Sequence, residues 1–189
     1  MKLVTLDDIR AAAERIRARV VRTPLLAARW GDDERPLWVK PENLQPIGAF
    51  KVRGAFNKLT RIAEHRVIAA SMGNHAQAVA YAAGKLGKQS TIVMPETASI
   101  IKQEATRGYG ADVVLHGEKF NDALDHALSR KNAVFIHPFD DDAVIAGQGT
   151  CAREFIEQTD GLDMVVAPIG GGGMISGTCL TLATLAPET

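Results

Sequence analysis

The stretch Val67-Ile68-Ala69-Ala70-Ser71-Met72-Gly73-Asn74-His75 decides the fold class. Its first four residues form a continuous apolar run, which is typical of a strand that is buried on both faces of a sheet. Gly73 and Asn74 interrupt this run, and a helical pattern then continues to Leu86. The stretch therefore predicts a strand that passes through a short loop into a helix, as in a parallel βαβ unit.

Strands and helices alternate in the same way on both sides of this stretch. The predicted strands are Pro36–Lys40, Val67–Ala70, Ser90–Met94, Asp112–Leu115, Ala133–Ile136 and Asp163–Ala167. The predicted helices are Leu6–Val20, Phe50–Ala63, Asn74–Leu86, Ala98–Tyr109, Lys119–Arg130, Ala143–Glu157 and Met174–Leu185. This alternation predicts an α/β fold in which helices cover parallel sheets.

We expect two lobes rather than two consecutive domains. Residues 42–144 form the predicted small inserted α/β lobe, and residues 1–41 together with 145–189 form part of a larger lobe. Ligands of open parallel sheets bind beyond the carboxyl ends of the strands. Separate segments of this chain are therefore expected to meet in a cleft between the lobes.

The composition argues against several classes of partner. Lysine plus arginine and aspartate plus glutamate number 22 each in the 189 residues, so no net charge favours nucleic acid or an anionic membrane. No apolar run is long enough to span a bilayer, and the start of the chain does not resemble a secretory signal, so we expect a cytoplasmic protein. Cysteines and histidines show no metal-ligand spacing, and Asp140–Asp142 predicts a solvated turn before a helix rather than a metal site.

Lys51 is the first candidate for chemistry. It follows Phe50, lies between Gly48 and Gly54, and stands at the predicted start of a helix. A lysine that reacts with a carbonyl group must be rigid, partly desolvated and next to an apolar surface. The alternative is a surface lysine that opens an amphipathic helix, with Phe50 in the core.

The glycine run Gly170–Gly173 is the second candidate, because it follows a predicted strand and precedes a helix. Without side chains, its backbone N–H groups can approach an anion, which the helix dipole also favours. The run matches neither the dinucleotide fingerprint nor a phosphate loop that ends in Lys-Ser/Thr. A small phosphorylated cofactor is therefore favoured, and a flexible turn is the alternative.

The third candidate is the loop Ser71–His75 after the predicted strand Val67–Ala70. Its backbone N–H groups are predicted to bind a carboxylate, and Asn74 is predicted to contact a cofactor oxygen. The alternative is an ordinary helix N-cap, in which His75 makes only a local hydrogen bond. The segment Gly147–Thr150 is unusual within a helical pattern and predicts close packing near the cleft, without an assigned chemistry.

Taken together, these motifs resemble the threonine dehydratase and serine racemase family of fold-type II pyridoxal-phosphate (PLP) enzymes, which have the tryptophan synthase β-like fold. The resemblance runs almost end to end. The matching segments are Arg22–Leu25, Lys40–Pro46, Gly48–Ala55, Ser71–Gln77, His137–Asp141, Ala146–Thr150 and Pro168–Gly173.

The resemblance implies a role for each motif. Lys51 matches the lysine that forms a Schiff base with pyridoxal 5'-phosphate and removes the substrate α-proton. The residues that match cofactor-binding positions are Lys51, Phe50, Asn74, Gly170, Gly171, Gly172, Gly173 and Met174. The residues that match the substrate-carboxylate loop are Ser71, Met72, Gly73, Asn74 and His75. The implied reaction converts a small β-hydroxy amino acid, threonine or serine, into a 2-oxo acid and ammonia, and homodimers are a family expectation.

Two departures from the family pattern qualify this prediction. Met72 replaces the serine that serves racemases as an acid–base group, which favours dehydration over racemisation because methionine transfers no proton. Family members also continue well past Thr189, so the larger lobe is expected to be incomplete, with an exposed apolar edge. Two alternatives follow: a shortened derivative with little activity alone, and a related lyase that acts on hydroxyaspartate or another β-substituted amino acid.

Overall fold

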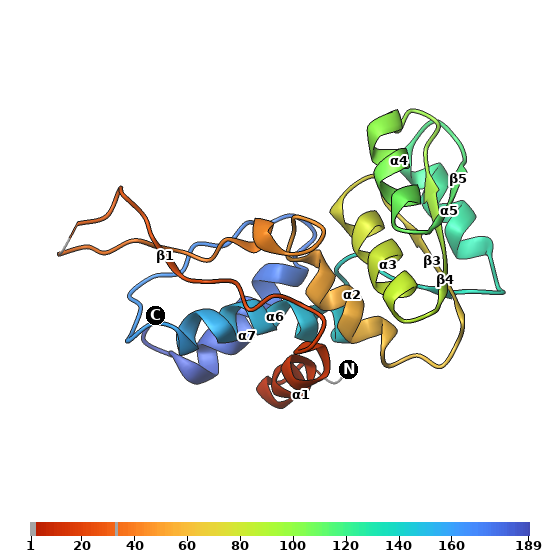
Figure 1. Ribbon diagram of the computed structural model, residues 1–189. Helices are drawn as coiled ribbons and strands as arrows, with labels where there is room; N and C mark the ends of the chain where they lie inside the picture. Colours follow the sequence, from red (N-terminus) through yellow and green to blue (C-terminus); the bar gives the residue numbers. More distant parts are fainter. Residues whose placement is uncertain (1–2, 33) are drawn as a thin grey trace.

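A computed structural model describes residues 3–32 and 34–189. Figure 1 shows a sheet with its helices at one side of the molecule, a group of helices in the middle, and an extended hairpin on the far side. No helix among the described residues is long and apolar enough to cross a membrane. The described residues also contain no group of three or more His, Cys, Asp or Glu side chains that could hold a metal ion.

The sheet contains β3 (Arg66–Ala70), β4 (Gln89–Met94), β5 (Asp112–Leu115) and β6 (Val134–Phe135). Its order is β5-β4-β3-β6, and all neighbours are parallel. The register places Val67 of β3 opposite Ser90 of β4 and Val134 of β6. The α/β prediction is confirmed, and each of these strands lies within one residue of its predicted bounds.

Both faces of the sheet are covered, which explains why its strands are continuously apolar. The helices of this region are α3 (Asn74–Lys85), α4 (Ile100–Gly108) and α5 (Phe120–Ser129). Val67 and Ile92 pack in the core cluster with the alanines of α3, whereas Ile68 and Val93 pack on the other face with Ala123 of α5. Successive residues of a strand point to opposite faces, so a continuous apolar run fills both layers.

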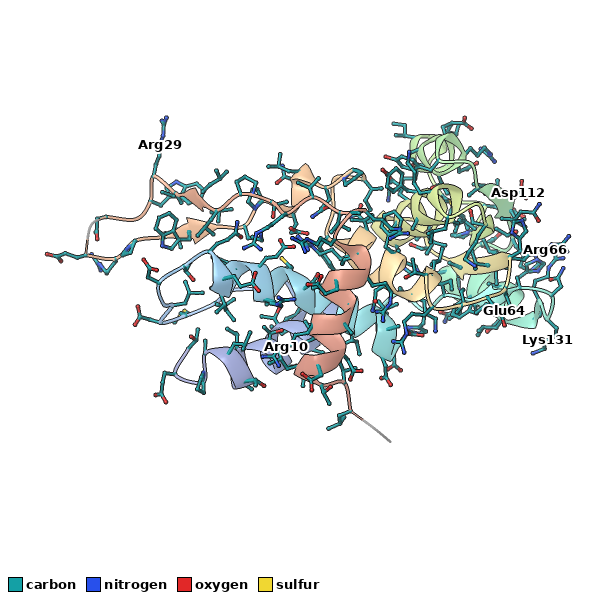
Figure 2. All side chains as sticks on the ribbon, turned by 60° about the horizontal axis from the view of Figure 1, so that its bottom comes forward. Arg10, Arg29, Glu64, Arg66, Asp112 and Lys131 are labelled. Carbon is teal, nitrogen blue, oxygen red and sulfur yellow. The ribbon has the colours of Figure 1, made fainter. Side chains whose placement is uncertain are left out.

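The amino ends of the strands face away from the rest of the molecule. Figure 2 shows Glu64, Arg66, Asp112 and Lys131 gathered at the far end of the sheet, where β3 and β5 begin. The carboxyl ends of the strands therefore point toward the four-helix group. This is the edge at which open parallel sheets bind ligands.

The four-helix group is built around one central helix. Its members are α1 (Leu6–Ile16), α2 (Lys51–Leu59), α6 (Asp142–Glu157) and α7 (Gly173–Leu185). Helix α6 packs against α1, α2 and α7, and α2 also packs against α3. Helix α2 belongs to the predicted small lobe and most of α6 to the predicted larger lobe, so the two predicted lobes contact each other through these helices. The division into lobes stays a prediction.

Side chains cap the starts of two helices. Thr5 and Asp8 form the capping box of α1. Asp141 caps α6 by accepting hydrogen bonds from the backbone N–H groups of Ala143 and Val144; Asp140 and Asp141 thus precede the helix as predicted, and Asp142 is its first residue. Helices α1 and α2 end four residues before the predicted Val20 and Ala63.

Glycines bring α6 into backbone contact with two other helices. A Cβ atom at Gly147 of α6 would lie 2.6 Å from the Cα atom of Gly54 in α2. A Cβ atom at Gly177 of α7 would lie 2.6 Å from the backbone nitrogen of Gly149. The close packing predicted for Gly147–Thr150 is therefore present. It fixes the helix that carries Lys51 relative to the helix that follows the glycine run.

The predicted strand Asp163–Ala167 is wrong. No described segment pairs with these residues, and a strand needs a neighbour to accept and donate its backbone hydrogen bonds. Met164 and Val166 are 76% and 89% exposed. The glycine run consequently follows an unpaired segment rather than a strand.

The hairpin is a second difference from the sequence analysis. Strand β1 (Leu26–Ala27), which was not predicted, pairs antiparallel with β2 (Trp38–Val39), which is shorter than the predicted Pro36–Lys40. A 3-10 helix, η1 (Glu42–Leu44), then leads toward α2. Lys51 therefore starts a helix that does not directly follow a strand. Apolar residues are exposed in the hairpin at Leu37, Trp38 and Val39, and in the unpaired segment at Met164 and Val166.

Candidate active site

Lys51 and the glycine run line one cavity of ≈ 350 Å³. The lining residues come from three separated parts of the chain. They are Phe50, Lys51, Phe139, Pro168, Ile169, Gly170, Gly171, Gly172, Gly173 and Met174. Two of the three predicted motifs thus meet, although more than a hundred positions separate them in the sequence.

The amine of Lys51 is held in place and partly shielded from water. Its Nζ atom donates a hydrogen bond to the backbone carbonyl oxygen of Pro138 at 2.7 Å and lies 5.5 Å from the ring centroid of Phe50. Burial lowers the pKa of Lys51 below its usual value, because desolvation disfavours the ammonium form. A lysine in this state supplies more neutral amine for reaction with a carbonyl group than a solvated lysine does.

The glycines of the run are required for different reasons. Gly172 has a φ of +94°, a left-handed conformation that glycine adopts without strain. A Cβ atom at Gly171 would collide with the ring of Phe139, and one at Gly173 would lie 3.0 Å from the carbonyl oxygen of Phe139. Close packing of Phe139, which the sequence analysis did not anticipate, therefore explains two of the four glycines.

The remaining space at the run can receive an anion. An added Cβ atom at Gly170 or Gly172 would meet nothing within 4 Å, so side chains there would fill open space. Helix α7 begins at Gly173, and the first N–H groups of a helix lack partners within the helix. Such N–H groups and the helix dipole attract phosphate. Together with the amine of Lys51, this set fits a phosphorylated aldehyde, the chemical class of pyridoxal phosphate.

The loop Ser71–His75 lies at the carboxyl end of β3 and the start of α3, as predicted, but it does not line this cavity. The N–H group of Gly73 donates to Oγ of Ser71 at 3.1 Å, and Asn74 is exposed. His75 is linked to the site electrostatically, because the positive charge of Lys51 contributes to its lowered pKa. The substrate and cofactor roles of the five loop residues remain predictions.

His75 is fully enclosed and neutral. Its Nε2 atom lies 2.9 Å from the carbonyl oxygen of Ile136, which only accepts, so the nitrogen carries the hydrogen. Burial is the main cause that lowers the pKa of His75 to about 4. The bond is not local, as the alternative interpretation assumed, since it joins the start of α3 to the residue after β6.

This pKa predicts an acid sensitivity that depends on His75. Between the unfolded value of about 6.5 and the folded value of about 4, the unfolded chain binds a proton that the folded chain excludes. The free energy of unfolding should therefore fall as the pH drops through this range, and this contribution is fully present above it. We expect His75→Gln to reduce the stability difference between pH 7 and pH 4.5 in urea titrations; an unchanged difference would contradict the prediction.

Phe139, Pro168 and Ile169 line the cavity and were not among the predicted site residues. Phe139 and Pro168 belong to segments that resemble the family, and Phe139 stands shortly after a predicted strand, which is a signal for a ligand site. Ile169 carries no such signal beyond its position beside the glycine run.

Comparison with known proteins identifies the relatives of this chain. Residues 16–189 match the family described as pyridoxal-phosphate dependent enzyme. The chain is 46% identical over 199 residues to the beta-hydroxyaspartate dehydratase of Paracoccus denitrificans, with 100% of this chain and 63% of the relative covered. It is 43% identical over 198 residues to an L-threonine ammonia-lyase of Thermotoga maritima, with 98% of this chain and 49% of the relative covered.

Solved structures show the same similarity in three dimensions. The maize serine racemase superimposes with a TM-score of 0.93 at 34% identity, over 99% of this chain and 60% of that one. The processed threonine deaminase isoform 2 of Solanum lycopersicum gives a TM-score of 0.88 at 37% identity, over 100% and 56%. The chain thus spans about half to somewhat under two thirds of the length of these relatives.

Proposed function

Because this chain belongs to the pyridoxal-phosphate-dependent enzymes, we propose that it converts a β-hydroxy amino acid into a 2-oxo acid and ammonia. The observation that carries this proposal is the meeting of Lys51 with the glycine run in one cavity. The cavity offers an amine for a carbonyl group and an anion site for a phosphate, and the rings of Phe50 and Phe139 help to line it. Threonine and serine are the proposed substrates.

Each residue of the cavity has a proposed task. When bound, pyridoxal phosphate supplies an electron sink that makes the α-proton of an amino acid acidic. Lys51 Nζ accepts that proton as general base, a role that suits an amine with a lowered pKa. The backbone N–H groups of Gly170–Gly173 and Met174 hold the phosphate, and Phe50 and Phe139 limit the access of water.

The choice of reaction rests on Met72. A racemase must return a proton to the face opposite the lysine, and a thioether cannot carry a proton for this purpose. Met72 is half-buried against the main core cluster, which is also an ordinary place for methionine. We therefore propose elimination of the β-hydroxyl group rather than racemisation. The loop Ser71–His75 is the proposed carboxylate site, because it opens α3 and His75 lies within electrostatic range of Lys51.

A substrate panel tests this proposal. The purified chain, saturated with pyridoxal phosphate, is incubated with threonine, serine and β-hydroxyaspartate, and release of 2-oxo acid is measured. We expect turnover of at least one hydroxy amino acid, and no D-serine from L-serine. The relative from Paracoccus makes β-hydroxyaspartate the second candidate substrate. Turnover of β-hydroxyaspartate alone would favour that candidate, and D-serine formation would contradict the argument from Met72.

A second candidate function follows from the length of the match. The chain spans only 49% to 63% of its curated relatives, and the apolar side chains of Met164 and Val166 are exposed. A chain that binds the cofactor but turns over no substrate alone would fit these observations. Cofactor binding without 2-oxo acid release from any of the three substrates would favour it. The homodimer and the cytoplasmic location stay predictions, and sedimentation velocity would test the dimer.

A further inference from the structure

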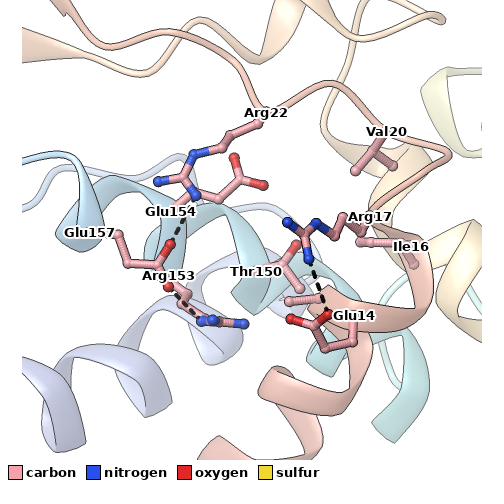
Figure 3. Close-up of a pocket in the computed structure, with 10 residues that line it drawn as sticks. Glu14, Ile16, Arg17, Val20, Arg22, Thr150, Arg153, Glu154 and Glu157 are labelled. Carbon is pink, nitrogen blue, oxygen red and sulfur yellow. Dashed lines mark hydrogen bonds and ion pairs between the residues drawn. The ribbon is translucent and has the colours of Figure 1, made fainter.

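A cluster of four charged side chains lies behind the first turn of α2. It consists of Arg53, Glu42, Glu154 and Lys40, which we call the Arg53 cluster. The side chain of Arg53 is 0% exposed, and those of Glu42, Glu154 and Lys40 are 12%, 15% and 4% exposed. Figure 3 shows Glu154 and Thr150 of α6 in a cavity that α1 also borders. In the same cavity, Arg22 and Arg153 form ion pairs with Glu157 and not with Glu154.

The guanidinium group of Arg53 forms two hydrogen bonds with each of the carboxylates of Glu42 and Glu154. Nε and Nη2 donate to the two oxygens of Glu42 at 2.7 and 2.8 Å, and Nη1 and Nη2 donate to the two oxygens of Glu154 at 2.8 and 2.9 Å. The group also donates to Thr150 Oγ1 at 3.2 Å and to the carbonyl oxygen of Val21 at 3.3 Å. Such a fork-shaped arrangement uses the planar geometry that distinguishes arginine from lysine.

The other members of the cluster are equally well bonded. Lys40 Nζ donates to Glu154, to Gln158 Oε1 and to the carbonyl oxygen of Thr23, at 2.7 to 2.8 Å. Two cations and two anions balance one another. Buried ion pairs often add little net stability, because desolvation of the charges offsets their attraction. Stability alone is therefore a weak reason for so many buried charges at this position.

The position of the cluster relative to Lys51 suggests another reason. Arg53 follows Lys51 by two residues, and each helical residue turns by about 100°, so the two side chains leave α2 on nearly opposite sides. The next residue, Gly54, is the point of backbone contact with Gly147 of α6. Arg53 thus ties the first turn of α2 to α6 and to the segments around Val21 and Glu42.

We propose that the Arg53 cluster positions Lys51, by fixing the rotation of the first turn of α2 so that Nζ stays at the carbonyl oxygen of Pro138 and in the cavity. Arg53 touches neither the cavity nor the glycine run, so it acts through Lys51. The inference extends the proposed function, but only its cofactor consequence rests on that function. The placement of the amine can be measured without any cofactor.

Arg53→Lys is the test variant, because lysine keeps the positive charge but lacks the planar guanidinium group that bonds both carboxylates. The control is Lys58→Met on the same helix, which breaks the ion pair with Asp141 (2.6 Å) far from the first turn. The pH midpoint of Lys51 acetylation is followed by mass spectrometry in the cofactor-free chain. Two histidines near Lys51 could also affect its midpoint: His75 at the start of α3, and His137 next to Pro138. Neither variant changes these histidines.

We expect Arg53→Lys to move the midpoint of Lys51 upward, toward the value of about 10.4 of a solvated lysine, and Lys58→Met to leave it in place. Where the chain binds pyridoxal phosphate, Arg53→Lys should weaken binding by about tenfold, as loss of supporting contacts does around metal ligands. Glu42→Gln, a milder change, should move both quantities in the same direction if Arg53→Lys does not fold.

Two results would overturn the inference. One is an unchanged Lys51 midpoint in Arg53→Lys and in Glu42→Gln. The other is an equal shift in Lys58→Met, which would show that any loss of stability in α2 releases Lys51. Failure of the parent chain to bind pyridoxal phosphate would count against the proposed function, while the acetylation midpoints would still decide the role of the cluster.

Discussion

Lys51→Ala is expected to abolish covalent attachment of pyridoxal phosphate to this chain. Among the described residues that line the cavity, Lys51 is the one lysine, and its amine is held at Pro138. Alanine offers no nitrogen that can react with the aldehyde, so the loss should be complete rather than partial. The measurement is the visible absorption spectrum after addition of pyridoxal phosphate, followed by borohydride reduction and mass mapping of the modified peptide.

Lys58→Ala is the matched control for this experiment. Lys58 lies on the same helix and binds Asp141 rather than facing the cavity. The control should keep the absorption band and the modified Lys51 peptide. A band of equal strength in Lys51→Ala would show that another lysine holds the cofactor. No band in any of the three proteins would mean that this length of chain does not form the cofactor site.

The strand and helix units of residues 66–129 could be predicted well, because each is specified by its own residues. Apolar runs such as Val67–Ala70 read directly as strands buried on both faces, and β5 has the predicted bounds. The start of α6 was predicted within one residue, because the acidic residues Asp140–Asp142 suit the first turn of a helix. These signals are local and need no knowledge of the partners in space.

Features that depend on a partner in space were missed. Asp163–Ala167 has the composition of a strand, but no described residue offers it a neighbour. Phe139 could not be assigned to the site, because its role follows from packing against Gly171. The sequence likewise predicted a cofactor role for the glycine run. It did not predict that Gly171 and Gly173 must lack a side chain because Phe139 packs against them.

The site was therefore predicted in part. Lys51, Phe50, Gly170–Gly173 and Met174 meet in one cavity, whereas Ser71–His75 lies outside it at the start of α3. The first group could be predicted because a reactive lysine and an anion site each impose unusual residues, glycine above all. A carboxylate loop uses the same residue types as an ordinary helix start, so its sequence carries no signal of its own.

Gly147→Ala is expected to destabilise the fold, although alanine favours helices over glycine by about 1 kcal/mol. A Cβ atom at Gly147 would lie 2.6 Å from Gly54 Cα and 2.8 Å from the carbonyl oxygen of Arg53. Both neighbours are backbone atoms, so no side chain can rotate to make room, and α2 must move away from α6. Overpacking of this kind costs about 1–3 kcal/mol or more. We expect a net loss of about 2 kcal/mol in the free energy of unfolding.

Gly108→Ala provides the control that separates packing from helix propensity. Gly108 ends α4, and an added Cβ atom there would meet nothing within 4 Å, so this variant should be neutral or slightly more stable in urea titrations. Because α2 carries Lys51, displacement by Gly147→Ala should also weaken binding of pyridoxal phosphate, and Gly108→Ala should not. Equal stability of the two variants would show that α2 and α6 can separate freely, and the cavity would then lack the rigid support that its geometry indicates.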